Sequence, residues 1–256
     1  MNPATVLGMI GGIFLLTVTI ALTARDYSAF WNLPGLGIVL GGTIAATLVS
    51  YPLHEVLRVF RVFIIVLRSE RYYAKEDMEE IVEVSRQWFK GNLAAIESRL
   101  DDIRNPYLRM GIQLVIDDTP LDDILTLLQW RMTRLRAKET AEAQVFRTMA
   151  MYAPAFGMLG TLVGLINMLF GMEGADFESI GVNLGIALIT TFYGIILANL
   201  VFKPIAIKME RRTEQRVMLM NMVLEGITLM SKGRSPAYIR ETLKSFMARY
   251  EDEIRQ

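Results

Sequence analysis

The chain is divided by four long stretches that contain no Lys, Arg, Asp or Glu, namely residues 3–24, 27–53, 148–172 and 179–202. An α-helix rises about 1.5 Å per residue, so roughly 20 apolar residues cross a bilayer core about 30 Å thick. All four stretches reach this length. The pattern therefore predicts four transmembrane helices, over residues 3–24, 32–53, 148–172 and 179–202.

Between the second and third stretches, residues 54–147 show the spacing of amphipathic helices and no strand alternation. We expect helices from Glu55, over 76–90 with an end at Gly91, and over 93–104. Thr119-Pro120 places a capping residue and a proline at the start of a further helix that continues into the third span. The sequence thus predicts an all-α integral membrane protein with a helical domain over 54–147.

Residues 203–256 are predicted to form a helical C-terminal tail. A charged helix over 205–230 ends before Gly233, and Ser235-Pro236 begins a last amphipathic helix.

The distribution of basic residues indicates the orientation. Many Lys and Arg flank the inner ends of spans two to four, whereas the two opposite connections contain only Arg25. Basic residues near span ends favour the cytoplasm. We therefore expect a multi-pass protein of the bacterial inner membrane, with residues 54–147 and both termini in the cytoplasm.

Composition excludes several classes of function. The chain has no cysteine and only one histidine, and it contains no nucleophile–base pair, phosphate-binding loop or metal-ligand motif. We expect no enzyme activity, no metal site, no cofactor and no nucleic-acid partner.

The predicted spans contain polar hydroxyls but no ionisable side chain. Thr161 lies near the middle of span three, and Thr190 and Thr191 lie near the middle of span four. Hydroxyl oxygens can bind a hard cation or order water, so these residues are candidates to line an ion pathway. Alternatively, each hydroxyl bonds to a backbone carbonyl one turn earlier in its own helix. If the protein conducts cations, the compensating carboxylate must come from another polypeptide.

Prolines and glycines mark further positions in the spans. Pro154 and Pro204 remove helical hydrogen bonds near the inner ends of spans three and four and are candidate hinges. Glycines four residues apart permit close helix packing, either within one subunit or between subunits. These pairs are Gly37 and Gly41, Gly160 and Gly164, and Gly181 and Gly185.

The two inner spans carry the most specific motifs. Residues 152–165 read YAPAFGMLGTLVGL, residues 187–194 read ALITTFYG, and residues 202–205 read FKPI. With the order of spans, these motifs resemble the MotA/PomA family, the A subunit of the flagellar motor stator, over the whole chain.

This resemblance implies a ring of five A subunits around two B subunits, whose membrane aspartate carries the ion. Ion influx then turns the ring, and its cytoplasmic rim pushes a FliG-like rotor switch protein. The transported cation, Na⁺ or H⁺, takes the place of a cofactor.

The resemblance also implies roles for individual residues. Pro154 and Pro204 match prolines linked to conformational change. Thr161 and Thr191 match hydroxyl positions of sodium-driven members, which favours sodium over protons.

Lys90 and Glu97 match the basic and acidic residues that face the rotor. Many members have an arginine beside the lysine, but Phe89 occupies that position here. Arg86 is the nearest arginine, one helical turn away, and we include it among the rotor-facing candidates.

An ExbB/TolQ-like complex that powers outer-membrane transport is the nearest alternative. Those proteins typically have three spans with the large inner segment after the first, whereas a complete membrane hairpin precedes it here. A stator-like complex for gliding or defence also stays open. A permease or self-contained channel would instead show paired buried charges or duplicated halves.

Overall fold

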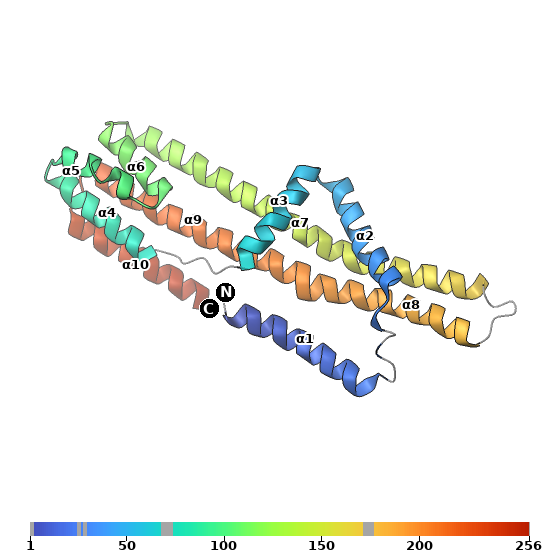
Figure 1. The fold of residues 1–256 in the computed structure, drawn as a ribbon. Helices are drawn as coiled ribbons and strands as arrows, with labels where there is room; N and C mark the ends of the chain where they lie inside the picture. Colours follow the sequence, from blue (N-terminus) through green and yellow to red (C-terminus); the bar gives the residue numbers. More distant parts are fainter. Residues whose placement is uncertain (1–2, 25–26, 28–29, 68–73, 171–176, 256) are drawn as a thin grey trace. The chain divides into compact units, whose positions relative to one another are not determined.

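The computed structural model describes residues 3–24, 27, 30–67, 74–170 and 177–255, and all regular elements among them are helical (Figure 1). The α-helices are α1 (Pro3–Thr23), α2 (Leu33–Ser50), α3 (Leu53–Leu67), α4 (Ala74–Phe89), α5 (Leu93–Glu97), α6 (Pro106–Ile116), α7 (Leu121–Phe170), α8 (Phe177–Ile196), α9 (Lys203–Ser231) and α10 (Pro236–Arg255). A 3₁₀ turn, η2 (Leu100–Asp102), follows α5, and a π-helical turn, η3 (Leu197–Phe202), joins α8 to α9.

Local sequence signals explain where many of these helices begin and end. The Asn32 side chain accepts a hydrogen bond of 2.8 Å from the Gly35 backbone N–H at the start of α2. Gly91 and Gly233, which follow α4 and α9, have φ values of +72° and +66°. Glycine adopts this left-handed conformation without a Cβ clash, so it terminates helices efficiently. The predicted ends at Gly91 and Gly233 are confirmed.

The prediction of one helix over residues 93–104 was wrong. The chain leaves the helix after α5, forms η2, and becomes extended at Ile103, where φ is −67° and ψ is 114°. A new helix, α6, then starts at Asn105-Pro106, with the Asn105 side chain accepting from the Tyr107 N–H at 3.0 Å. Asn105-Pro106 is the same type of start signal as Thr119-Pro120, and it could have revealed α6.

The structure divides into two compact units, and the division falls within α7 and α9. The first unit comprises Met1–Glu70 and Thr140–Glu210, and the second comprises Arg71–Glu139 and Arg211–Gln256. Helix α3 thus belongs to the first unit, together with the apolar helices, although its residues lie in the predicted segment 54–147.

The core of the first unit gathers side chains from α2, α3, α7, η3 and α9. Val39, Phe146, Met149, Phe202 and Met209 are among its buried members. Among the side chains that the structure describes, helix α1 contributes none to this core, and large apolar side chains such as Leu7, Phe14 and Leu22 are exposed on it.

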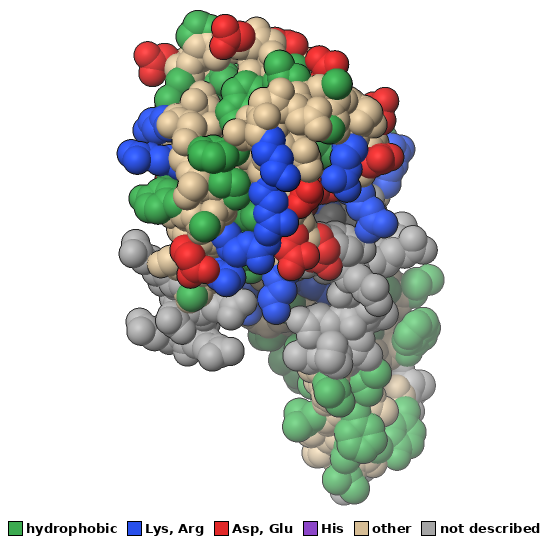
Figure 2. Space-filling view, turned by 90° about the vertical axis from the view of Figure 1, so that its left-hand side faces the viewer, with side chains coloured by type: hydrophobic (Ala, Val, Ile, Leu, Met, Phe, Trp, Pro, Cys, Tyr) green, Lys and Arg blue, Asp and Glu red, His purple; other side chains and the backbone are tan. Residues whose placement is uncertain are grey.

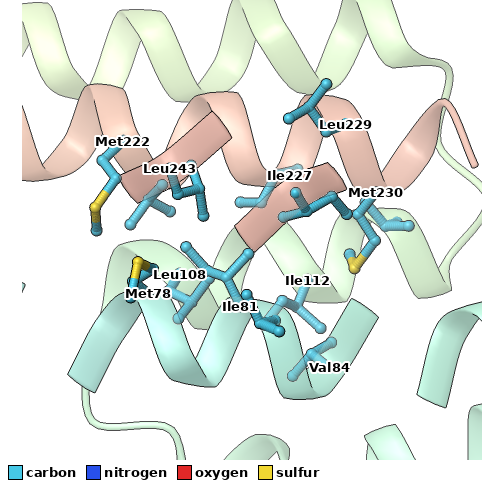
Figure 3. Close-up of a cluster of buried hydrophobic side chains, with 14 of the residues drawn as sticks. Met78, Ile81, Val84, Leu108, Ile112, Met222, Ile227, Leu229, Met230 and Leu243 are labelled. Atoms are coloured by element: carbon cyan, nitrogen blue, oxygen red, sulfur yellow. The ribbon is translucent and has the colours of Figure 1, made fainter. Parts of the chain in front are cut away.

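The second unit has its own core, to which α4, α5, α6, α7, α9 and α10 contribute buried side chains. Ile81, Leu108, Ile227 and Leu243 are at most 2% exposed and point toward one another (Figure 3). This core explains the amphipathic patterns of α4, α6 and α10, since each helix turns its apolar face inward.

Within the described residues, three helical segments are long and apolar enough to cross a membrane, namely Leu33–Ser50, a window within Leu121–Phe170, and a window within Ile180–Ser231. They correspond to predicted spans two, three and four. Helix α1, Pro3–Thr23, lies over the residues predicted for span one. Its apolar part, Ile10–Thr23, is shorter than the three segments named above. The span at α1 stays a prediction.

Candidate ion pathway and coupling residues

Helices α7 and α8 pack closely because glycines of α7 face α8. A Cβ atom on Gly160 would lie 2.7 Å from the Thr190 side chain, and one on Gly164 would lie 2.8 Å from the Ala187 Cβ. The same substitution at Gly37, Gly41, Gly181 or Gly185 would meet no atom of the described residues within 4 Å. Among the residues that the structure describes, therefore, only the pair Gly160 and Gly164 of the three predicted pairs packs closely against another helix.

This close packing brings the three predicted threonines together. The hydroxyl oxygens of Thr161 and Thr191 lie 2.6 Å apart, across the interface between α7 and α8. Both hydroxyls also lie within hydrogen-bond distance of the Gly157 carbonyl oxygen, at 3.1 Å for Thr161 and 3.3 Å for Thr191. The Ala187 carbonyl is 3.0 Å from the Thr161 hydroxyl.

Thr190 is placed differently from the other two threonines. It is fully buried, and its hydroxyl can donate to the carbonyls of Ala187 at 2.8 Å and Gly157 at 3.1 Å. Thr161 and Thr191 are only partly buried. The Thr190 hydroxyl therefore links α8 to α7 by a hydrogen bond. The hydroxyls of Thr161 and Thr191 lie nearer the surface of the helix pair.

The cluster offers neutral oxygen atoms from two hydroxyls and two carbonyls. Hard cations bind such oxygens, and a hydroxyl can both donate and accept when it orders water. The alternative prediction was that each threonine hydroxyl bonds to a carbonyl one turn earlier in its own helix. The Thr161 hydroxyl does reach the Gly157 carbonyl, but it also reaches Ala187 and Thr191 on α8.

Sequence reasoning missed a tyrosine that connects this region to the start of α2. The Tyr193 hydroxyl donates to the Phe30 carbonyl at 2.6 Å and accepts from the Asn32 backbone N–H at 2.9 Å. The Phe30 and Phe192 rings pack edge to face, with centroids 5.9 Å apart. A tyrosine in an apolar helix needs a partner for its hydroxyl, and this was the available signal.

The two candidate hinge prolines lie in different local structures. Pro154 is inside the continuous helix α7. It contacts α8 closely, because a Cβ on Gly194 would lie 2.6 Å from the Ala153 carbonyl oxygen and 3.1 Å from the Pro154 Cα.

Pro204 follows the π-helical turn η3, in which the Lys203 N–H bonds to the Ala198 carbonyl five residues earlier. Proline lacks an N–H and crowds the carbonyl four residues before it, so a widened turn relieves this contact. The chain then continues as α9 without ending the helix.

The three rotor-facing candidates are exposed around the connection between α4 and α5. Lys90 precedes Gly91, and Glu97 is the last residue of α5. Arg86 pairs with Glu83 in its own helix at 3.1 Å. Charges of both signs are interspersed on the surface of the second unit (Figure 2).

Ion pairs connect α7 with neighbouring helices of the first unit. Arg58 of α3 lies 2.9 Å from Glu142, whose side chain is only 8% exposed. Arg147 and Glu210 form a bidentate ion pair, and the hydrogen bonds from Arg147 hold the pKa of Glu210 below its usual value. In the second unit, Glu139 of α7 accepts from both Thr213 and Arg216 of α9.

One buried carboxyl in the second unit has a perturbed pKa. Asp77 of α4 is 7% exposed, and burial raises its pKa, while a 2.8 Å hydrogen bond from the Asn105 side chain opposes the shift. Nearby Glu76 raises it further. Asp77 joins α4 to the start of α6 and belongs to the architecture of this unit.

Comparison with known proteins places the chain among bacterial motility proteins. Residues 99–222 match the MotA/TolQ/ExbB proton channel family. The chain is 31% identical to the chemotaxis protein PomA of Vibrio alginolyticus over 252 residues, which cover 96% of each chain. It is 29% identical to Motility protein A of Borreliella burgdorferi over 247 residues, covering 96% of this chain and 94% of that protein.

The fold is also similar to that of a solved structure. Superposition on a chain of the flagellar MotAB stator complex from Bacillus subtilis gives a TM-score of 0.87 and covers 98% of each chain, with 23% sequence identity. At this identity the likeness concerns the fold alone.

Proposed function

Because this chain belongs to the MotA/PomA branch of the MotA/TolQ/ExbB proton channel family, we propose that it is the A subunit of an ion-driven flagellar motor stator. The observation that carries this proposal is the similarity to motility proteins over nearly the whole chain. That similarity extends over the residues of α1 and α2. In our proposal these two helices are spans that precede the large inner segment, an order that distinguishes this chain from the ExbB/TolQ-like alternative.

The membrane arrangement follows from the same proposal. Four spans, α1, α2, the outer half of α7, and α8, cross the bacterial inner membrane. The second unit and both termini lie in the cytoplasm, as the basic residues at the inner span ends favour. Five copies surround two B subunits, in the arrangement that the family resemblance implies.

The ion pathway passes the Thr161–Thr191 pair. The predicted spans contain no ionisable side chain, so a membrane aspartate of the B subunit supplies the charge that the hydroxyl and carbonyl oxygens lack. Each unit charge that moves down a potential of 100 mV releases about 2.3 kcal/mol, which is the order of energy available for rotation.

Sodium is the ion that we favour. Support comes from the chemistry of these groups, since two hydroxyls that hydrogen-bond to each other at 2.6 Å lie beside backbone carbonyls, and a hard cation takes neutral oxygens of both kinds as ligands. The family description names a proton channel, so the sodium assignment rests on these threonines.

Torque passes to a FliG-like rotor protein through Lys90 and Glu97, with Arg86 beside them. Their exposure at the α4–α5 connection supports this role, because partner charges can reach them. Pro154 and Pro204 supply the bends that connect ion passage with the movement of α7 and α9.

The proposal is tested by expressing the chain with its B subunit in cells that lack their own stators. Motor rotation should be restored, and its speed should follow external sodium at fixed pH and respond little to pH at fixed sodium. Replacing the membrane aspartate of the B subunit by asparagine is the matched control and should abolish rotation. Failure to rotate with an assembled complex in the membrane would reject the stator function, whereas dependence on pH alone would reject sodium.

A further inference from the structure

A bidentate ion pair between Arg147 and Glu210 joins helices α7 and α9. The Arg147 Nε donates to Glu210 Oε1 at 2.5 Å, and a terminal guanidinium nitrogen donates to Oε2 at 2.7 Å. Because the planar guanidinium meets both carboxylate oxygens, this contact fixes orientation as well as distance. The side chains are 45% and 31% exposed, and a pair so accessible to water contributes little to stability.

The position of the pair relative to the two prolines is more informative. Pro154 follows Arg147 by seven residues in α7, and Pro204 precedes Glu210 by six residues. At about 1.5 Å per residue, the pair lies roughly 10 Å from each proline, or two helical turns. Proline weakens a helix by removing a backbone hydrogen bond, so both helices can bend at nearly the same distance from this pair.

The segment between the prolines and the ion pair is tightly packed. Met149 and Ala153 of α7, with Ala206 and Met209 of α9, are at most 3% exposed and belong to one core cluster. On the other side of the prolines, Gly194 allows direct backbone contact with Ala153 and Pro154. Helix α7 is therefore packed against α9 on the inner side of the prolines and against α8 beside Pro154.

We propose that Arg147 and Glu210 are coupling residues of the motor. They hold α7 and α9 in fixed register on the inner side of the prolines, so that displacement at Thr161 and Thr191 moves both helices together. Without the pair, α7 and α9 bend separately at their prolines, and the displacement that starts at Thr161 and Thr191 does not reach the cytoplasmic parts of the two helices. The inference rests on the proposed stator function, and both residues act by positioning, since neither lies among the threonine oxygens.

Charge reversal and charge exchange test this role in the complete complex with its B subunit. The variants are Arg147→Glu, Glu210→Arg and the exchanged double variant. Three quantities are measured for each, namely torque at stall, ion uptake per complex, and the amount of assembled complex in the membrane. Glu241→Gln, which removes an exposed pair with Lys244 within α10, is the matched control and should leave all three unchanged.

Each single reversal should lower stall torque at least fivefold, while ion uptake and assembly stay within twofold of the parent. The exchanged double variant should recover at least half of the torque. Unchanged torque in the single variants would overturn the proposal. So would equal loss of torque and ion uptake, or no recovery on exchange in an assembled complex.

Two milder variants keep the test decisive if the charge-reversed variants do not assemble. Glu210→Gln loses the charge and Arg147→Lys loses the bidentate geometry, while both keep a similar side-chain volume. Both should lower torque with ion uptake retained. If these variants also fail to assemble, the pair is structural and the coupling role is wrong. Failure of the stator function itself is recognised separately, because the parent complex would then show neither torque nor ion uptake.

Discussion

The hydroxyl oxygens of Thr161 and Thr191 lie 2.6 Å apart, although the residues are thirty positions apart in the chain. The contact exists because glycines at 157, 160 and 164 let α7 approach α8 without intervening side chains. It places two hydroxyls from different helices at one point of the predicted membrane region.

Replacing Thr161 by alanine should weaken sodium dependence. One hydroxyl bond is worth on the order of 1 kcal/mol, so the sodium concentration for half-maximal motor speed should rise about fivefold to tenfold. Thr161→Ser keeps the oxygen and should remain near the parent. Thr190→Ala is a second control: it should lower stability without shifting the sodium dependence, because Thr190 is fully buried. A parent motor indifferent to sodium removal would contradict sodium coupling.

Gly164→Ala should destabilise the complex. The added methyl group would lie 2.8 Å from the Ala187 Cβ and 3.0 Å from its backbone nitrogen, and a backbone cannot move aside easily. Overpacking of this kind costs about 1–3 kcal/mol, measured as a lower unfolding temperature of the purified complex.

Gly41→Ala is the matched control, since the added methyl group would meet none of the described atoms of this chain within 4 Å. It should be neutral or slightly stabilising. If it instead prevented assembly, Gly41 would face another subunit. Equal stability of the Gly164 and Gly41 variants would contradict the close packing of α7 on α8.

Reversing the charge at Lys90 or Glu97 should reduce torque at least twofold while the amount of assembled complex stays constant. Both residues are exposed, so reversal leaves the core of the second unit intact. Torque is measured on single motors. The control is Lys232→Glu, at an exposed residue directly after α9. Loss of the complex from the membrane would show a structural role instead.

The predicted orientation is tested by labelling introduced cysteines, because the native chain has none to interfere. A membrane-impermeant maleimide applied outside should modify a cysteine at position 174 and leave one at position 233 unmodified until the membrane is opened. Position 174 lies outside the described residues, and position 233 follows α9. Labelling of both from outside would reject cytoplasmic placement of the C-terminal helices.

Asp77→Asn should stabilise the protein at neutral pH more than at acidic pH. Burial raises the folded-state pKa of Asp77 above its ordinary value of 3.8. The fold therefore favours the protonated form, and this stabilisation is fully present below pH 3.8 and is lost as pH rises through the raised pKa. Asparagine stays neutral throughout this range and avoids the cost of an ionised buried carboxylate.

The measurement for Asp77 is the unfolding temperature of parent and variant between pH 4 and pH 7. The difference between them should grow toward pH 7. A constant difference between parent and variant would show that the pKa of Asp77 is not raised by folding.

Much of this protein was determined by local sequence. Uncharged stretches located the apolar helices, because a membrane span cannot carry solvated charges. Cap residues and glycines located most helix ends, because they act on the backbone beside them. Asn105-Pro106 carried such a signal too, so α6 could have been predicted.

Tertiary structure decided which of these residues meet. Equivalent glycine spacing occurs in α2, α7 and α8, yet within the described part of the chain only the pair in α7 packs closely against another helix. Likewise, Thr190 and Thr191 are neighbours in sequence, but the rotation of α8 buries one and leaves the other beside Thr161. Contacts such as Tyr193 with Asn32 and Arg147 with Glu210 join distant segments. Their partners depend on how the helices pack, and no local pattern contains that information.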